Sequence, residues 1–194
     1  FVVCNTDAQA LDKSEVPTKI QLGIELTEGL GAGSNPETGC KAAEESIDKV
    51  KELLDANTKM LFITAGMGGG TGTGAAPVIA EVAKEKDILT VGVVTIPFST
   101  EGGNRHEYAM QGLKELRKYV DTLLVINNDK LIEIYGNLTF TQAFAKANEV
   151  LNTATKGIAE VISQHLLVNI DLNDARRVLE NSGTAVMGQA TASG

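Results

Sequence analysis

Residues 66–74 read Gly-Met-Gly-Gly-Gly-Thr-Gly-Thr-Gly, between an apolar run at 60–65 and a run at 75–84 that is typical of a helix. The apolar run predicts a buried strand, so the glycines form a strand-to-helix turn. A tight turn needs one or two glycines for positive φ angles, whereas this turn has six in nine residues. Backbone N–H groups in such a turn can close on an anion, and the helix dipole favours negative charge there. The stretch therefore predicts a phosphate-binding loop.

Two common phosphate-binding motifs do not fit these residues. The Walker A motif requires Lys and then Ser or Thr after its last glycine, but Gly74 is followed by Ala75-Ala76-Pro77. The dinucleotide fingerprint G-x-G-x-x-G fails because Gly74 follows Gly70 and Gly72 one residue too early, which disfavours a dehydrogenase. The flanking strand and helix patterns disfavour a flexible linker. The loop therefore belongs to another class of nucleotide site.

The composition argues against several classes of partner and location. The 194 residues carry a net charge of -8 without a basic block, which argues against nucleic acid as a partner. No apolar run approaches the roughly 20 residues that span a membrane, so direct membrane insertion is not expected. Cys4 and Cys40 have neither metal-ligand spacing nor a disulfide framework, so a reducing cytoplasm is the expected location. Cys4 is expected to be a small core residue.

Strand-like and helix-like segments alternate along the chain. Strands are expected at 1–4, 19–22, 60–65, 89–95 and 122–126, and helices from Pro36 to Leu54, at 75–84, at 105–120 and from Thr141 to about Leu167. This order predicts an α/β fold, an open parallel Rossmann-like sheet with helices on both faces. The long last helix leads to a short helix and to a strand at 184–190. A second glycine-rich loop at 29–36 also falls at the carboxyl ends of the strands, where ligands bind in such sheets.

Several motifs occur in the order typical of one family. They are Asn5-Thr6-Asp7-Ala8-Gln9-Ala10-Leu11, the loop at 29–36, the glycine stretch at 66–74, Pro97-Phe98 with Glu101-Gly102, Asn128-Asp129-Lys130-Leu131, and residues 169–174. With them the chain resembles the FtsZ-type cell-division GTPases, bacterial relatives of tubulin, over essentially its whole length. The resemblance implies a protein that binds GTP or GDP, polymerises head to tail with itself, and hydrolyses GTP where subunits meet. It also implies a place at the division site, with accessory division proteins bound through segments outside these residues.

The resemblance further implies which residues contact the nucleotide. The α- and β-phosphates would be held by Gly70, Thr71 and Gly72, the γ-phosphate would be reached by Ala32, Gly33, Ser34 and Asn35, and Asn5, Gly69 and Thr73 would complete the set. Glu101 and Arg105 would contact the ribose, although their spacing alone suggests an i,i+4 ion pair. Phe144 would pack on guanine, although an inward Phe on a long helix is ordinarily a core residue. Asn128 and Asn148 would bind the guanine edge. Many family members carry Asp in place of Asn148, which here forgoes a charge-assisted hydrogen bond.

Catalysis is expected from Asp171 and Asp174, with Asn169 helping to position their loop. Without the resemblance, two carboxylates three residues apart at a helix start would be interpreted as caps. In the family this loop enters the nucleotide pocket of the next subunit, where a carboxylate would orient the attacking water. Mg²⁺ would be carried by the nucleotide, because no carboxylate cluster in the sequence predicts a metal site. A non-catalytic, nucleotide-gated scaffold would share every motif except the need for Asp171 and Asp174.

The resemblance divides the chain into two parts. Residues 1–168 would form a GTP-binding domain without the family's first strand and first glycine-rich loop. Residues 169–194 would supply the catalytic loop, a short helix and the first strand of a second domain. The sequence is therefore expected to be a fragment, or its missing pieces to be disordered or to belong to another chain, with two exposed strand edges and with weak or no GTP binding of its own. Gly103-Asn104, where basic residues are common in the family, would weaken binding further.

Overall fold

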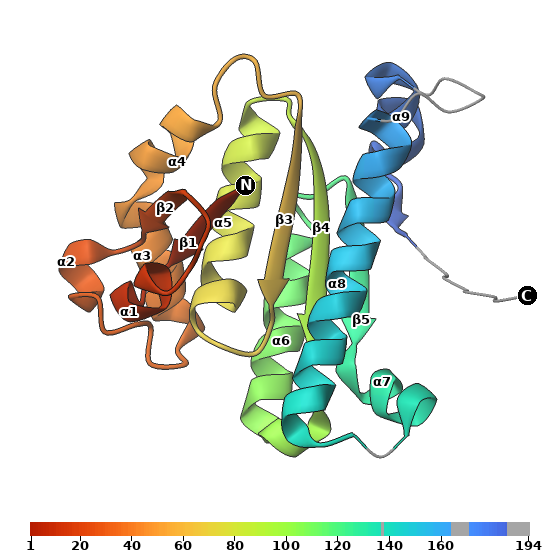
Figure 1. Cartoon of the computed structure of the whole chain (residues 1–194). Helices are drawn as coiled ribbons and strands as arrows, with labels where there is room; N and C mark the ends of the chain where they lie inside the picture. Colours follow the sequence, from red (N-terminus) through yellow and green to blue (C-terminus); the bar gives the residue numbers. More distant parts are fainter. Residues whose placement is uncertain (137, 164–170, 186–194) are drawn as a thin grey trace, which may run out of the picture.

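The computed structural model describes residues 1–136, 138–163 and 171–185 (Figure 1). In chain order the elements are β1 Val2–Asn5, α1 Ala8–Asp12, β2 Thr18–Gln21, α2 Ile24–Thr27, α3 Pro36–Glu45, α4 Ile47–Leu53, β3 Met60–Gly66, α5 Thr71–Glu85, β4 Leu89–Ile96, the 3₁₀ turn η1 Ser99–Glu101, α6 Gly103–Leu116, β5 Thr122–Asn127, α7 Asn128–Tyr135, α8 Phe140–Ser163, α9 Leu172–Leu179 and β6 Gly183–Thr184. Strands and helices therefore alternate as predicted. Most of the strand expected at 184–190 lies outside the described residues.

The strands form two parallel sheets. β1 pairs with β2, while β3, β4, β5 and β6 follow one another in the second sheet. In its register Ala65 lies opposite Val94, and Val94 lies opposite Val125. Because every pair is parallel, the carboxyl ends of the strands in each sheet meet at one edge. The predicted α/β fold with parallel strands is confirmed.

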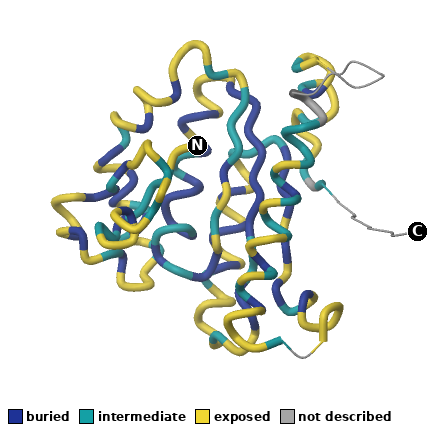
Figure 2. Tube along the Cα trace, in the orientation of Figure 1, coloured by how far each residue is buried: buried dark blue, intermediate teal, exposed yellow. Residues whose placement is uncertain are grey.

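Helices cover both faces of the larger sheet (Figure 1). Successive side chains of a strand point to opposite faces, so neighbouring residues of β4 pack against different helices. Val94 packs with Ala80 of α5 and Leu116 of α6, whereas Val91 packs with Ala154 of α8. Val91 and Val94 are fully buried, and Figure 2 shows β4 buried between helices whose outer faces are exposed. Burial on both faces explains why the strand sequences are nearly continuous apolar runs.

The predicted single helix from Pro36 to Leu54 is wrong, because it is interrupted at Ser46. At Ser46 the backbone leaves helical geometry (φ -98°, ψ 14°), so that α3 ends and α4 begins. The Ser46 side chain is buried, and its Oγ accepts a hydrogen bond from the Gly23 N–H at 3.0 Å. A serine that bonds to distant backbone competes with the helix at its own position. Such a long-range partner leaves no signal in the helical periodicity.

A cleft separates the two sheets. In the described part of the chain β1 pairs with β2 alone and β3 pairs with β4 alone, so one edge of β1 and one edge of β3 are unpaired. The space that they border measures about 1150 Å³, and its lining includes Val3 and Ile20 on one side and Phe62 and Ile63 on the other. Two open strand edges therefore border a largely apolar space.

Candidate nucleotide-binding site

The glycine stretch lies at the carboxyl end of β3, where the chain turns into α5 (Figure 1). Helix α5 begins at Thr71 with Gly70 at its N-cap, and no side chain caps it. Among the described residues, the backbone N–H groups of residues 69–73 have no acceptor. An uncapped helix start offers such donors to an anion, and the dipole of this 15-residue helix adds a positive potential. The loop has the donor set that the sequence predicts for a phosphate.

The second glycine-rich loop touches the first. A Cβ at Gly70 would lie 2.6 Å from the Cβ of Ala32 and 2.9 Å from the backbone N of Asn35. A Cβ at Gly68 would lie 2.8 Å from the carbonyl oxygen of Arg105. Only glycine allows backbones to approach this closely. Segments from 32–35 and around 105 therefore meet at the glycine stretch.

Part of the glycine content serves packing rather than ligand binding. A Cβ at Gly74 would collide with the carbonyl oxygen of Pro36 at the start of α3. Thr73 is buried, and its Oγ1 accepts a hydrogen bond from the Gly68 N–H at 2.8 Å. The Thr73 hydroxyl thus fixes the shape of the loop itself. The excess of glycine has a second cause, the close contact between α5 and its neighbours.

Thr6 is a member of the site that the sequence analysis did not single out. Its side chain is fully buried, and its Oγ1 lies 2.6 Å from the Oγ1 of Thr71. This hydrogen bond joins the end of β1 to the first residue of α5. Thr6 lies inside the motif at 5–11. Nothing in the spacing of that motif predicts a hydrogen bond to a residue 65 positions away.

The cleft between the sheets brings four of the predicted residues together. Asn5 at the end of β1, Thr71 and Gly72 at the start of α5, and Asn148 on α8 all line it. Asn148 is exposed. Three segments that are distant in the sequence therefore meet at one end of this cleft.

The residues expected to hold the base lie around the same edge of the larger sheet. The Phe144 ring packs edge-on against Phe98 at 5.1 Å and against Phe140 at 4.8 Å between ring centroids. Asn128, the first residue of α7, is 3% exposed, and its Oδ1 has no hydrogen-bond partner within the described chain. Buried polar atoms without a partner are uncommon in folded proteins, so this oxygen is a candidate ligand acceptor.

Glu101 and Arg105 form the ion pair that their spacing suggests. The Glu101 Oε2 lies 3.5 Å from the Arg105 Nη1. Glu101 is mostly buried and its Oε1 also accepts the Phe98 N–H at 2.9 Å, whereas the Arg105 side chain is 46% exposed. The pair itself stabilises the helix start by only about 0.3–0.5 kcal/mol. Its place next to Gly68 is the feature relevant to the site.

Asp171 and Asp174 lie at the opposite end of the sheet, with α9 (Figure 1). Helix α9 is bound there because Arg176 contacts Asp87, which precedes the amino end of β4. β4 has eight residues, so at about 3.3 Å per residue the two ends of the sheet, with the glycine stretch at one and α9 at the other, are about 25 Å apart. Both are exposed and form a reciprocal cap, in which each carboxylate accepts the backbone N–H of the other. Asn169 lies outside the described residues.

The described residues could also have held a metal site, a membrane-spanning helix or a reactive cysteine. They contain no group of three or more His, Cys, Asp or Glu side chains that could hold a metal ion. None of their helices has the length and apolar character that crossing a membrane requires. Cys4 packs, half-buried, against the cluster of Ile20 and Leu22, and this burial raises the pKa of its thiol.

The model of the tubulin/FtsZ family GTPase domain matches residues 1–136. The chain belongs to the tubulin/FtsZ family. Cell division protein FtsZ of Porphyromonas gingivalis is 53% identical over 188 residues, which are 96% of this chain and 41% of that protein. An empty FtsZ dimer from M. jannaschii superposes with a TM-score of 0.91 at 48% identity, over 94% of this chain and 53% of that chain. A GDP-bound monomer of CetZ1 from Haloferax volcanii superposes with a TM-score of 0.78 at 26% identity, over 94% and 55% of the two chains.

The resemblance predicted from the motifs is thus confirmed. The chain spans about half the length of the tubulin/FtsZ relatives that it matches. The matched GTPase domain contains both glycine-rich loops, Glu101, Arg105 and Asn128. It ends before Phe144 and Asn148, and before the carboxylates of α9.

Proposed function

We propose that this chain is the nucleotide-binding part of a tubulin-like GTPase that polymerises head to tail and hydrolyses GTP between subunits. The observation that carries the proposal is that the free amides at 69–73 lie at the carboxyl end of the larger sheet and the pair Asp171 and Asp174 at its amino end, one strand length (~25 Å) away. A group that orients or deprotonates water must lie within hydrogen-bond reach of it. The separation therefore supports completion of the site by a second copy.

The triphosphate would lie on the N–H groups of 69–73, next to the positive end of α5. Ala32–Asn35 would close over the γ-phosphate, since Ala32 and Asn35 already touch Gly70. The unpaired Oδ1 of Asn128 is an acceptor for an N–H of the guanine edge. The remaining contacts would come from Asn5 and Asn148 in the cleft, from Phe144 on the base, and from Glu101 and Arg105 on the ribose. Mg²⁺ would be carried in by the nucleotide and would offset its charge.

Hydrolysis would use water and a neighbour's carboxylate. Water attacks the γ-phosphorus, the bond to the bridging oxygen breaks, and GDP and phosphate leave. Asp171 or Asp174 of the next subunit would orient this water, while the amides of the glycine stretch hold the phosphate charge. Both carboxylates are exposed and bond only within their own helix turn among the described residues, so they are available to a second copy.

Such an interface joins two different surfaces and does not close on itself, so it generates filaments. The P. gingivalis relative is a cell division protein and the M. jannaschii structure is an FtsZ dimer, which supports self-association and a role at the cytoplasmic division site. Accessory proteins would bind through segments outside these residues. A nucleotide-gated scaffold without hydrolysis remains the alternative.

The concentration dependence of turnover separates an assembly-dependent GTPase from other activities. Because each working site needs two subunits, phosphate release from GTP should rise more steeply than linearly with protein concentration below the point at which polymers saturate. It should become linear above that point. A rate proportional to concentration throughout would contradict the proposal, and a zero rate with GTP bound would favour the scaffold.

We also propose that an extended strand fills the cleft between β1 and β3. Both strands run toward the glycine stretch, because Thr6 after β1 bonds to Thr71 after β3. Their facing edges carry free backbone groups, and the lining is largely apolar. A strand apolar on both faces would join the two sheets into one parallel sheet.

A synthetic peptide tests this filling of the cleft. A stretch of about six apolar, β-branched residues with lysines at both ends should raise the Tm of the chain by about 2–4 °C at ten times its Kd. The same composition with a central proline is the control, because proline removes a ladder hydrogen bond. Equal shifts with both peptides, or none with either, would contradict strand pairing.

A further inference from the structure

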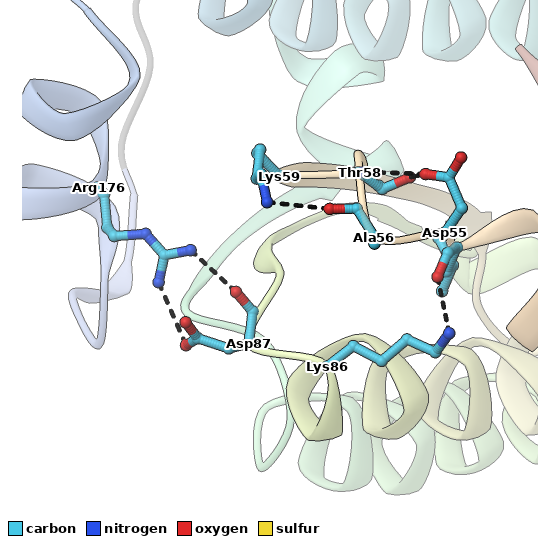
Figure 3. Close-up of a pocket in the computed structure, with 8 residues that line it drawn as sticks. Asp55, Ala56, Thr58, Lys59, Lys86, Asp87 and Arg176 are labelled. Atoms are coloured by element: carbon cyan, nitrogen blue, oxygen red, sulfur yellow. Dashed lines mark hydrogen bonds and ion pairs between the residues drawn. The ribbon is translucent and has the colours of Figure 1, made fainter.

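Helix α9 carries the proposed catalytic carboxylates, and two groups of contacts hold it on the amino end of the larger sheet. At its carboxyl end the Thr122 hydroxyl donates to the Leu179 carbonyl at 2.7 Å and bonds to Ser182 at 2.6 Å. In its middle, Arg176 donates from Nη2 to the Asp87 carbonyl at 2.9 Å and from Nη1 to the Asp87 carboxylate at 3.3 Å (Figure 3). Of these polar contacts, those of Arg176 are the nearest in the sequence to Asp171 and Asp174.

Asp87 is a well-held anchor for this arginine. It follows the end of α5 in the left-handed region (φ 54°), where its N–H donates to the Lys84 carbonyl at 3.1 Å. Such a residue ends a helix with a defined direction of its carbonyl. The next residue, Ile88, is buried in the core. The Asp87 carbonyl is therefore fixed by the backbone, while its carboxylate, on a side chain that is 91% exposed, adds a second and weaker acceptor.

Arg176, which anchors α9, lies on the side of the helix opposite to Asp174. Ala175 is 6% exposed and Arg176 is half-buried, whereas Asp171 and Asp174 are exposed. At about 100° per residue, Arg176 points some 200° away from Asp174. A rotation of α9 about its axis would break the contacts of Arg176 and turn the carboxylates away from their outward direction.

We infer that the pair of Asp87 and Arg176 is a positioning device, which fixes the rotation of α9 at which Asp171 and Asp174 face the next subunit. The inference rests on the proposed function, because the carboxylates act on a neighbour's nucleotide. Neither residue touches the nucleotide, so both act through the carboxylates. A misplacement of about 1 Å at a catalytic group can cost up to about 100-fold in rate.

Variants of the pair test this role through turnover and affinity together. In the protein that carries this chain, Arg176→Ala should lower kcat about tenfold and leave the Kd for GTP unchanged, because the nucleotide lies at the other end of the sheet. Asp87→Gly keeps the left-handed backbone and the carbonyl contact, so its loss should be smaller, and the double variant should be no worse than Arg176→Ala. Lys118→Ala, which removes the exposed ion pair with Glu115, is the control and should keep full kcat. An unchanged kcat for Arg176→Ala, or additive losses, would overturn the inference.

A mixed polymer shows whether the defect acts across the interface. One chain carries Asp171→Asn and supplies working pockets, and the other carries Gly70→Val and supplies working carboxylates. Adding Arg176→Ala to the Gly70→Val chain should lower the restored turnover about tenfold, whereas adding it to the Asp171→Asn chain should change nothing. If Arg176→Ala lowered the restored turnover equally on either chain, the substitution would destabilise the protein in general, and the inference would be overturned. If Asp171→Asn alone keeps wild-type turnover, the proposed function itself fails.

Discussion

Replacing Asp171 by Asn should lower GTP turnover by about 100-fold or more and leave GTP affinity within about twofold of the wild type. The carboxylate lies at the end of the sheet opposite to the glycine stretch of its own chain, one strand length (~25 Å) away, so its loss does not disturb the bound nucleotide directly. Turnover falls because the neighbour's water loses its orienting charge. Initial rates of phosphate release and equilibrium binding of a fluorescent GTP analogue measure the two quantities.

Asn is chosen because Asp171 also caps α9, accepting the N–H groups of Asn173 and Asp174 at 2.8 and 2.9 Å. Asn caps a helix about as well as Asp, whereas Ala costs about 1 kcal/mol. Asp171→Ala should therefore match Asp171→Asn in turnover and differ from it only in stability. Turnover lost in the Ala variant alone would mean that the cap, and not the carboxylate, matters. Equal losses of turnover and affinity would contradict an action across the interface.

Replacing Gly70 by Val should abolish GTP binding, with a loss of affinity of at least about 100-fold. A Cβ at Gly70 would stand 2.6 Å from the Ala32 Cβ and 2.9 Å from both the backbone N and the O of Asn35. The two loops would have to separate. The amides at 69–73 and the loop at 32–35, which would contact the γ-phosphate, could then no longer bind the same triphosphate together. Gly70 has φ -78°, so the effect is steric and not conformational strain.

Gly103→Ala is the matched control for Gly70→Val, because an added Cβ there meets nothing within 4 Å. It should bind GTP as the wild type does. Circular dichroism and thermal unfolding of both variants report whether the fold persists. Wild-type affinity in a folded Gly70→Val protein would contradict a site built on the glycine stretch.

The parallel sheet and the glycine loop could be predicted because their signals are local. A strand buried on both faces must be an apolar run, as at 89–95. The helix after the glycine stretch was also predicted, but it begins at Thr71, four residues before the predicted start at Ala75. The place of the glycine stretch after a strand was predicted, whereas its contact with the loop at 29–36, which follows α2, was not. The cap formed by Asp171 and Asp174 was also visible in their spacing.

The remaining features depend on partners far away in the sequence. The break at Ser46 comes from its bond to Gly23, the Thr6 hydroxyl finds Thr71, and Asp87 finds Arg176. None of these contacts alters the apolar periodicity or the motif spacing on which a prediction from one sequence depends. The packing role of Gly74 was hidden for a related reason, since a ligand loop and a close helix contact both require glycine.

Mixing the two disabled variants tests most directly whether the site is shared between subunits. Asp171→Asn retains the pocket, Gly70→Val retains the carboxylates, and neither alone should hydrolyse GTP. In equal mixtures that pellet together, a random head-to-tail order pairs a working pocket with working carboxylates at about one quarter of the interfaces. We therefore predict a restored turnover of about one quarter of the wild-type rate at equal total protein. A mixture that co-pellets but is no faster than the two variants measured separately would contradict the account.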